Sequence, residues 1–150
     1  MSRIASGQTS SRNGELVHIN PEALHDPTSS GYTHVVVAPL EGRTIYASGQ
    51  GADHRGSGLS LDFSAQLDSA LDNMRIALQA GGATVHDVVR ITLLIVDHTE
   101  ALLPVWGEAA RRVWGDGPFP ASTLIPVPRL ALDGMLVEIE ATAVVVEKRA

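Results

Sequence analysis

Cysteine is absent from all 150 residues of this chain, and aromatic residues make up only 4% of it. Without cysteine there are no disulfide bonds, no thiol nucleophile and no thiolate ligand for a metal ion. The scarcity of aromatic residues gives no support to a sugar-binding site. A cysteine-free chain fits a reducing compartment, so we expect a cytoplasmic protein.

Basic residues are also few: 11 Lys and Arg stand against 17 Asp and Glu, and the formal net charge is −6. Affinity for a phosphate backbone depends on clustered Lys and Arg, so this balance predicts no binding to nucleic acid. No apolar run approaches the roughly 18 residues that a membrane helix needs. The first twelve residues contain no apolar stretch typical of a signal peptide. We expect a soluble protein with no membrane partner.

The overall composition is typical of a globular protein, with 44% hydrophobic and 19% charged residues. A chain of this length suits one domain with a substantial core. The small and polar residues at the start predict a flexible tail over residues 1–14. Residues 15–150 are then expected to form a single domain, because the sequence contains no internal repeat and no long linker.

Hydrophobic spacing predicts two helices. The first has apolar residues three or four positions apart, at Phe63, Leu67, Leu71, Met74 and Leu78. Asp62 favours its positive N-terminal end, and the glycines at 81–82 predict its end. The second helix is expected over about 102–114. Because Pro104 cannot lie deep inside a helix, this one either starts near Leu103 or is kinked.

Runs of β-branched residues predict strands at 33–39, 43–48, 88–96, 121–127 and 135–146, with a short edge strand over 15–20. The short link at 40–42 predicts a β-hairpin between the first two of the five main strands. Alternation along 135–146 sends one set of residues to the same side: Met135, Val137, Ile139, Ala141, Ala143 and Val145.

This order of elements predicts an α+β fold in which two helices cover one face of a sheet. The other face is expected to mix two kinds of side chain. The polar ones are Arg90, Thr92, Glu138, Glu140 and Thr142, and the apolar ones are Val88, Leu94, Val96, Leu136, Val144 and Val146. Such a face is too apolar to be fully exposed and too polar for a monomeric core. It predicts a subunit interface with polar pockets.

Several short motifs occur in a characteristic order between residues 31 and 146. They are Gly31-Tyr32, Ala47-Ser48-Gly49-Gln50, Leu71-Asp72-Asn73, Gly81-Gly82-Ala83, Phe119-Pro120-Ala121, Val127-Pro128-Arg129-Leu130 and Val137-Glu138-Ile139-Glu140-Ala141. In this order and spacing the sequence resembles the RidA/YjgF family, also called the reactive intermediate deaminase or L-PSP endoribonuclease family.

The resemblance implies a chorismate-mutase-like (ferredoxin-like) fold and a homotrimer whose sheets form a central barrel. It also implies ligand clefts at the three subunit interfaces. Active members of the family hydrolyse a 2-imino acid, or its enamine tautomer, to a 2-keto acid and ammonia. They use no metal and no organic cofactor.

Residue by residue, the resemblance assigns Glu138 to the glutamate that positions the attacking water and handles its proton. Tyr32 would form an aromatic wall of the cleft. Ser48, Gly49 and Gln50 would line the floor with backbone groups, and the backbone near Ser48 and Gly49 would assist the reaction.

The largest departure from the family is Ser122, because the family's deaminases carry an arginine directly after Phe-Pro-Ala. Leu124 stands where many relatives have a small polar or thiol residue. A charge-assisted hydrogen bond contributes roughly 1.5–3 kcal/mol, so its loss weakens carboxylate binding tenfold to a hundredfold or more. Arg90 and Arg129 are candidates for a substitute cation. We expect a substrate-binding pocket that prefers something other than a simple 2-imino acid.

Other functions remain open on the residues alone. The missing arginine equally suits a non-catalytic trimer that binds a metabolite or a protein. Ribonuclease activity, which one of the family's names suggests, is disfavoured by the acidic charge. Six histidines without an H-x-H or H-x-x-x-H pair predict no metal site. The stretch GQGADHRGSG lacks the spacing of a nucleotide-binding loop.

Overall fold

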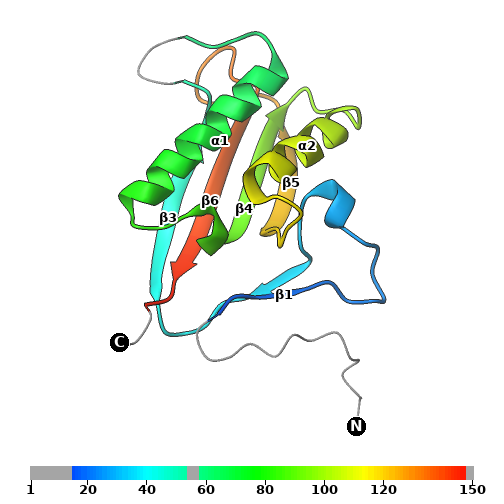
Figure 1. Ribbon diagram of the computed structural model, residues 1–150. Coiled ribbons are helices and arrows are strands. Elements are labelled where there is room, and N and C mark those ends of the chain that lie inside the picture. Colours follow the sequence, from blue (N-terminus) through cyan, green and yellow to red (C-terminus); the bar gives the residue numbers. More distant parts are fainter. Residues whose placement is uncertain (1–14, 54–57, 148–150) are drawn as a thin grey trace.

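The computed structural model describes residues 15–53 and 58–147 (Figure 1). The tail expected at 1–14 and part of the glycine-rich stretch lie outside these residues. The strands are β1 (Val17–Ile19), β2 (Val35–Val37), β3 (Arg43–Gln50), β4 (Val88–Val96), β5 (Ala121–Val127) and β6 (Val137–Val145). The helices are α1 (Phe63–Ala80) and α2 (Leu102–Trp114), with short 3-10 turns at Thr28–Ser30 and Val85–Asp87.

The main sheet has four strands in the order β3-β6-β4-β5. β6 pairs antiparallel with both β3 and β4, whereas β4 and β5 run parallel, so the sheet is mixed. Both helices lie on the same face of this sheet (Figure 1). The expected α+β fold with two helices on one face is therefore confirmed.

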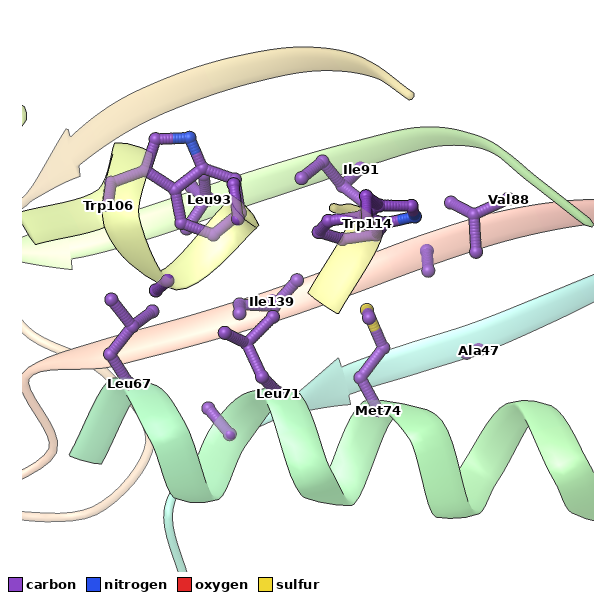
Figure 2. Close-up of a cluster of buried hydrophobic side chains, with 14 of the residues drawn as sticks. Ala47, Leu67, Leu71, Met74, Val88, Ile91, Leu93, Trp106, Trp114 and Ile139 are labelled. Carbon is purple, nitrogen blue, oxygen red and sulfur yellow. The ribbon is translucent and has the colours of Figure 1, made fainter. Parts of the chain in front are cut away.

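Helix α1 forms where the apolar spacing predicts it. The Asp62 carboxylate accepts a hydrogen bond from the backbone N–H of Ala65 at 2.8 Å, which satisfies one of the free donors of the first turn. Leu67, Met74 and Leu78 are fully buried against the sheet. Figure 2 shows this face of α1 together with the buried side chains of β4, β6 and α2.

Helix α2 covers residues 102–114, and Pro104 lies in its first turn. The first turn has no intrahelical acceptors for its N–H groups, so proline costs little there. The indole rings of Trp106 and Trp114 lie edge to face with centroids 6.5 Å apart (Figure 2). The Trp114 indole N–H donates to the Val85 carbonyl at 2.9 Å, which ties the end of α2 to the 3-10 turn before β4.

The hairpin predicted between 33–39 and 43–48 is wrong. β2 pairs with β1 in a separate two-stranded sheet, in the register Val17↔Val37. β3 pairs instead with β6, from Arg43↔Val145 to Gln50↔Ile139. This long antiparallel partner bonds far more of β3 than the three residues of β2 could. The link at 40–42 therefore connects two sheets.

Val88 was expected on the uncovered face but lies in the helix-side core (Figure 2). The pairing of β4 with β6 shifts register between Val88 and Arg90. Such a bulge inserts one extra residue and reverses the alternation beyond it. Val88 thus points to the same side as Ile91 and Leu93, while Arg90 points to the other.

Candidate functional site

The uncovered face of the sheet carries a polar hollow of about 430 Å³. Tyr46, Thr142 and Arg90 are direct partners across β3, β6 and β4, so their side chains share this face. The next row contains Glu140 and Thr92. The hollow is lined by Tyr46, Ala47, Ser48, Arg90, Thr92, Glu140, Ala141 and Thr142. It therefore offers a cation, a carboxylate and several hydroxyl groups in one place.

Glu138 lies directly against the backbone of Gly49. A Cβ atom placed on Gly49 would overlap the Glu138 carboxyl group, approaching its Cδ to 2.6 Å. Because glycine has no Cβ, the carboxyl group can approach this closely, and the pairing of β3 with β6 shifts register here, between Ala47 and Gln50. The Gln50 side-chain amide donates to the Ser48 carbonyl at 3.0 Å. We call Ser48, Gly49, Gln50 and Glu138 the glutamate half-site.

Tyr32 lies beside the start of β5, at the other edge of the sheet. Its neighbour Thr33 bridges Ala121 and donates its backbone N–H to the Pro120 carbonyl at 3.0 Å. Ser122 is the next residue of β5, so the chain brings the backbones of Tyr32 and Ser122 close together. We call Tyr32, Ser122 and Leu124 the tyrosine half-site.

The two half-sites do not meet within one chain. Ser122 pairs with Ile91 and Leu124 pairs with Leu93, and these β4 residues point into the core beneath the helices. Ser122 and Leu124 therefore point to the helix side, opposite to Arg90 and its partner Thr142. β3 and β5 are also the two edges of the sheet, three strand spacings or about 14 Å apart.

The two candidate arginines have different surroundings. Arg90 lines the polar hollow and forms no ion pair within residues 15–53 and 58–147. Arg129 follows β5 in sequence and pairs with Asp133 at 3.1 Å. Ser122 is near the opposite end of that strand, five residues or about 17 Å from Val127. Within one chain, neither guanidinium occupies the place where the family's deaminases carry an arginine.

A loop of polar residues presents Tyr32. The Tyr32 hydroxyl and Nε2 of His25 are 2.5 Å apart, and the His34 ring packs against both of their rings. Hydrogen bonds from the hydroxyl and the backbone N–H of Thr28 lower the pKa of the Asp26 carboxyl, with His25 as a weaker cause. This contact of His25 could not be predicted from the sequence, because an isolated histidine in a polar loop resembles any surface histidine.

Among residues 15–53 and 58–147, no three His, Asp or Glu side chains lie close enough together to hold a metal ion. No helix in this part of the chain is long and apolar enough to span a bilayer.

A mixed sheet with two helices on one face, and a glutamate held against a glycine of the neighbouring strand, defines a small α+β protein of the RidA type. The family model described as endoribonuclease L-PSP matches residues 23–145. This chain belongs to that family, which is also known as RidA or YjgF.

Solved structures agree with this membership. YyfB from Yersinia pestis, a protein of unknown function of the conserved Rid protein family, is 34% identical with a TM-score of 0.80, covering 87% of this chain and 98% of that one. Rv2704 from Mycobacterium tuberculosis, of the YjgF/YER057c/UK114 family, is 28% identical with a TM-score of 0.59, covering 87% and 100%. The YjgF gene product from E. coli is 29% identical with a TM-score of 0.59, covering 71% and 84%. No curated protein sequence matches this chain.

Proposed function

We propose that this protein is a hydrolase of C=N bonds that converts an imine or enamine into a carbonyl compound and ammonia, without a metal or organic cofactor. The observation that carries the proposal is the Glu138 carboxyl group held against the Gly49 backbone. A carboxylate fixed beside a backbone floor is a suitable base for a water molecule. Family membership supports the same chemistry.

The reaction needs only a positioned base and a route for two protons. Glu138 accepts a proton from water while the water oxygen bonds to the imine carbon, and the C=N π pair moves onto nitrogen. Nitrogen takes up first the proton that Glu138 accepted and then the proton of the new hydroxyl group, the C–N bond breaks, and ammonia leaves as the carbonyl forms. Imine and water thus give a carbonyl compound and ammonia, and Glu138 ends as it began. Backbone N–H groups near Ser48 and Gly49 would stabilise the charge that develops.

A complete cleft requires a second copy of the chain, and we propose the homotrimer of the family. The glutamate half-site and the tyrosine half-site lie toward opposite edges of the sheet. Placed edge to edge, the β3 side of one subunit and the β5 side of the next would bring Glu138 and Tyr32 to the same boundary. The exposed face around Tyr46, which is 80% exposed in the single chain, would then line the barrel.

The substrate we propose lacks a carboxylate that must be clamped. Ser122 offers one neutral hydroxyl where a guanidinium would offer two parallel donors and a fixed charge. Arg90 could supply a cation to the substrate only from the uncovered face of the sheet, which lines the barrel in the proposed trimer. Imines of neutral amino compounds therefore fit this cleft better than 2-imino acids do. The cysteine-free sequence supports a cytoplasmic setting for this activity.

The test is hydrolysis of a panel of imines, including 2-iminopropionate generated by an amino acid oxidase. Glu138→Gln keeps the shape of the side chain but removes the base, so we expect at least a hundredfold loss of kcat. Glu108→Gln, an exposed position on α2, is the matched control and should hydrolyse imines at the wild-type rate. Wild-type rates in Glu138→Gln would refute the mechanism.

Ser122 also favours a second candidate, a trimer that binds a metabolite without converting it. A ligand that binds only the folded state raises the melting temperature. Screening neutral and anionic metabolites by thermal shift, followed by product analysis, separates the two functions. A stabilising ligand that is recovered unchanged supports the binding protein, and its turnover supports the hydrolase.

A further inference from the structure

Three aromatic rings meet in the loop that carries Tyr32. The ring centroids of His25 and His34 are 4.9 Å apart, those of Tyr32 and His34 are 5.4 Å apart, and all three pairs lie edge to face. The Tyr32 hydroxyl points at Nε2 of His25 at 2.5 Å. Each ring therefore limits the motion of the other two.

The loop around these rings is tied down on both sides. The His34 backbone N–H donates to the Asn20 side-chain oxygen at 2.9 Å. Gly31 has φ of 70°, and a Cβ there would come within 2.7 Å of Cβ of Ala110 on α2, so the loop sits tightly on that helix. Tyr32 is thus presented from a fixed support.

The hydrogen-bond partners determine where the protons are. Nε2 of His34 faces the His25 carbonyl oxygen at 2.9 Å, and a carbonyl only accepts, so His34 carries its proton on Nε2. Nε2 of His25 faces a phenolic hydroxyl. A phenol is the stronger donor and a bare imidazole nitrogen the stronger acceptor. The two histidines should therefore be opposite tautomers.

We infer that Tyr32 donates its hydroxyl proton to Nε2 of His25, and that His25 is a positioning residue which turns the Tyr32 oxygen into an acceptor for an N–H group of the ligand. The role toward a ligand rests on the proposed function, which places Tyr32 in the cleft. With its one proton engaged, the oxygen has only lone pairs to offer. The cleft then selects ligands that bring a hydrogen-bond donor, as an imine or enamine nitrogen does.

The tautomers can be read directly by long-range ¹H–¹⁵N NMR on the labelled full-length protein at mildly alkaline pH. We expect His25 protonated on Nδ1 and His34 protonated on Nε2, with the His25 signals identified by their loss in His25→Gln. In Tyr32→Phe, His25 should return to the Nε2–H form that predominates in water, while His34 stays unchanged. His86→Gln, at an exposed position, is the control and should leave both histidines as in the wild type.

A wild-type His25 protonated on Nε2, or one that Tyr32→Phe leaves unchanged, would overturn the inference whether or not the protein hydrolyses imines. Imine kinetics then test the role toward the ligand. Tyr32→Phe and His25→Gln should each lower kcat/KM about tenfold, and the double variant should lose no more than either single one. Unchanged kinetics in both single variants would overturn this role. If the wild-type protein hydrolyses no imine, that result counts against the proposed function alone. The hydrogen bond from Tyr32 to His25 is tested separately, by the tautomers.

Discussion

The two faces of the four-stranded sheet are built from alternate residues of the same strands, yet they serve different purposes. On β6, Val137, Ile139 and Ala143 point to the helices and are almost fully buried. Glu138 and Glu140 point the other way, onto a face that neither helix covers (Figure 1). One face forms the apolar core with the two helices, and the other carries a carboxylate, a guanidinium and hydroxyl groups around a polar hollow.

The uncovered face carries a well-buried residue as well as charged ones. Thr92 is only 7% exposed there, although no helix lies over it. Thr92 lines the polar hollow together with Tyr46 and Arg90.

We expect the largest loss of stability when a side chain on the helix-covered face of the sheet is shortened. Ile139→Ala removes a fully buried side chain from β6 and leaves a cavity beneath α1, so it should lower the free energy of unfolding by about 2–5 kcal/mol. Glu140→Ala, the next residue on the same strand but on the exposed face, should change it by less than about 0.5 kcal/mol. Urea denaturation of the two variants at equal concentration provides the measurement. Equal losses would mean that the uncovered face also contributes to the folding core.

A second prediction tests how closely the exposed face is packed at the glutamate half-site. Gly49→Ala places a methyl group where the Glu138 carboxyl lies, so it should destabilise the protein by about 1–3 kcal/mol and displace the carboxylate. Shortening the other partner, in the double variant Gly49→Ala/Glu138→Ala, should recover most of that loss. Thermal unfolding measures both variants. A double variant as unstable as Gly49→Ala alone would show that the cost arises from the backbone of β3 and not from this contact.

The helix-covered side of the fold could be predicted from the sequence, because burial of one face makes apolar residues recur at regular intervals. The spacing of Leu67, Leu71 and Met74 identified α1, and alternation along β6 identified its buried face. The register shift at Val88 and Arg90 could not be predicted, since one extra residue in a β-branched run leaves no mark on composition. The pairing of β1 with β2 was missed because a short turn favours a local hairpin, whereas the long partner β6 decides the pairing of β3.

The candidate site was predictable only to the extent that the family motifs carry it. The motifs pointed to Glu138 and Gly49, and these two residues lie against each other in the fold. That the half-sites lie toward opposite edges of the sheet follows from strand order, which no motif encodes. The contact of His25 with Tyr32 depends on how the loop between β1 and β2 folds on α2, and polar loops have no periodicity to reveal it.

The smallest expected effect concerns the contact that joins the two helices above the covered face. Nη2 of Arg112 on α2 lies 2.7 Å from the Asp68 carboxylate on α1, but each side chain is about half exposed. Water and salt screen such a pair, so a double-mutant cycle with Arg112→Gln and Asp68→Asn should give a coupling of about 0.2–1 kcal/mol. The coupling should shrink further in 1 M NaCl, where charges are screened within about 3 Å. A coupling above 2 kcal/mol that salt does not reduce would mean that the helices depend on this ion pair more than on the apolar core beneath them.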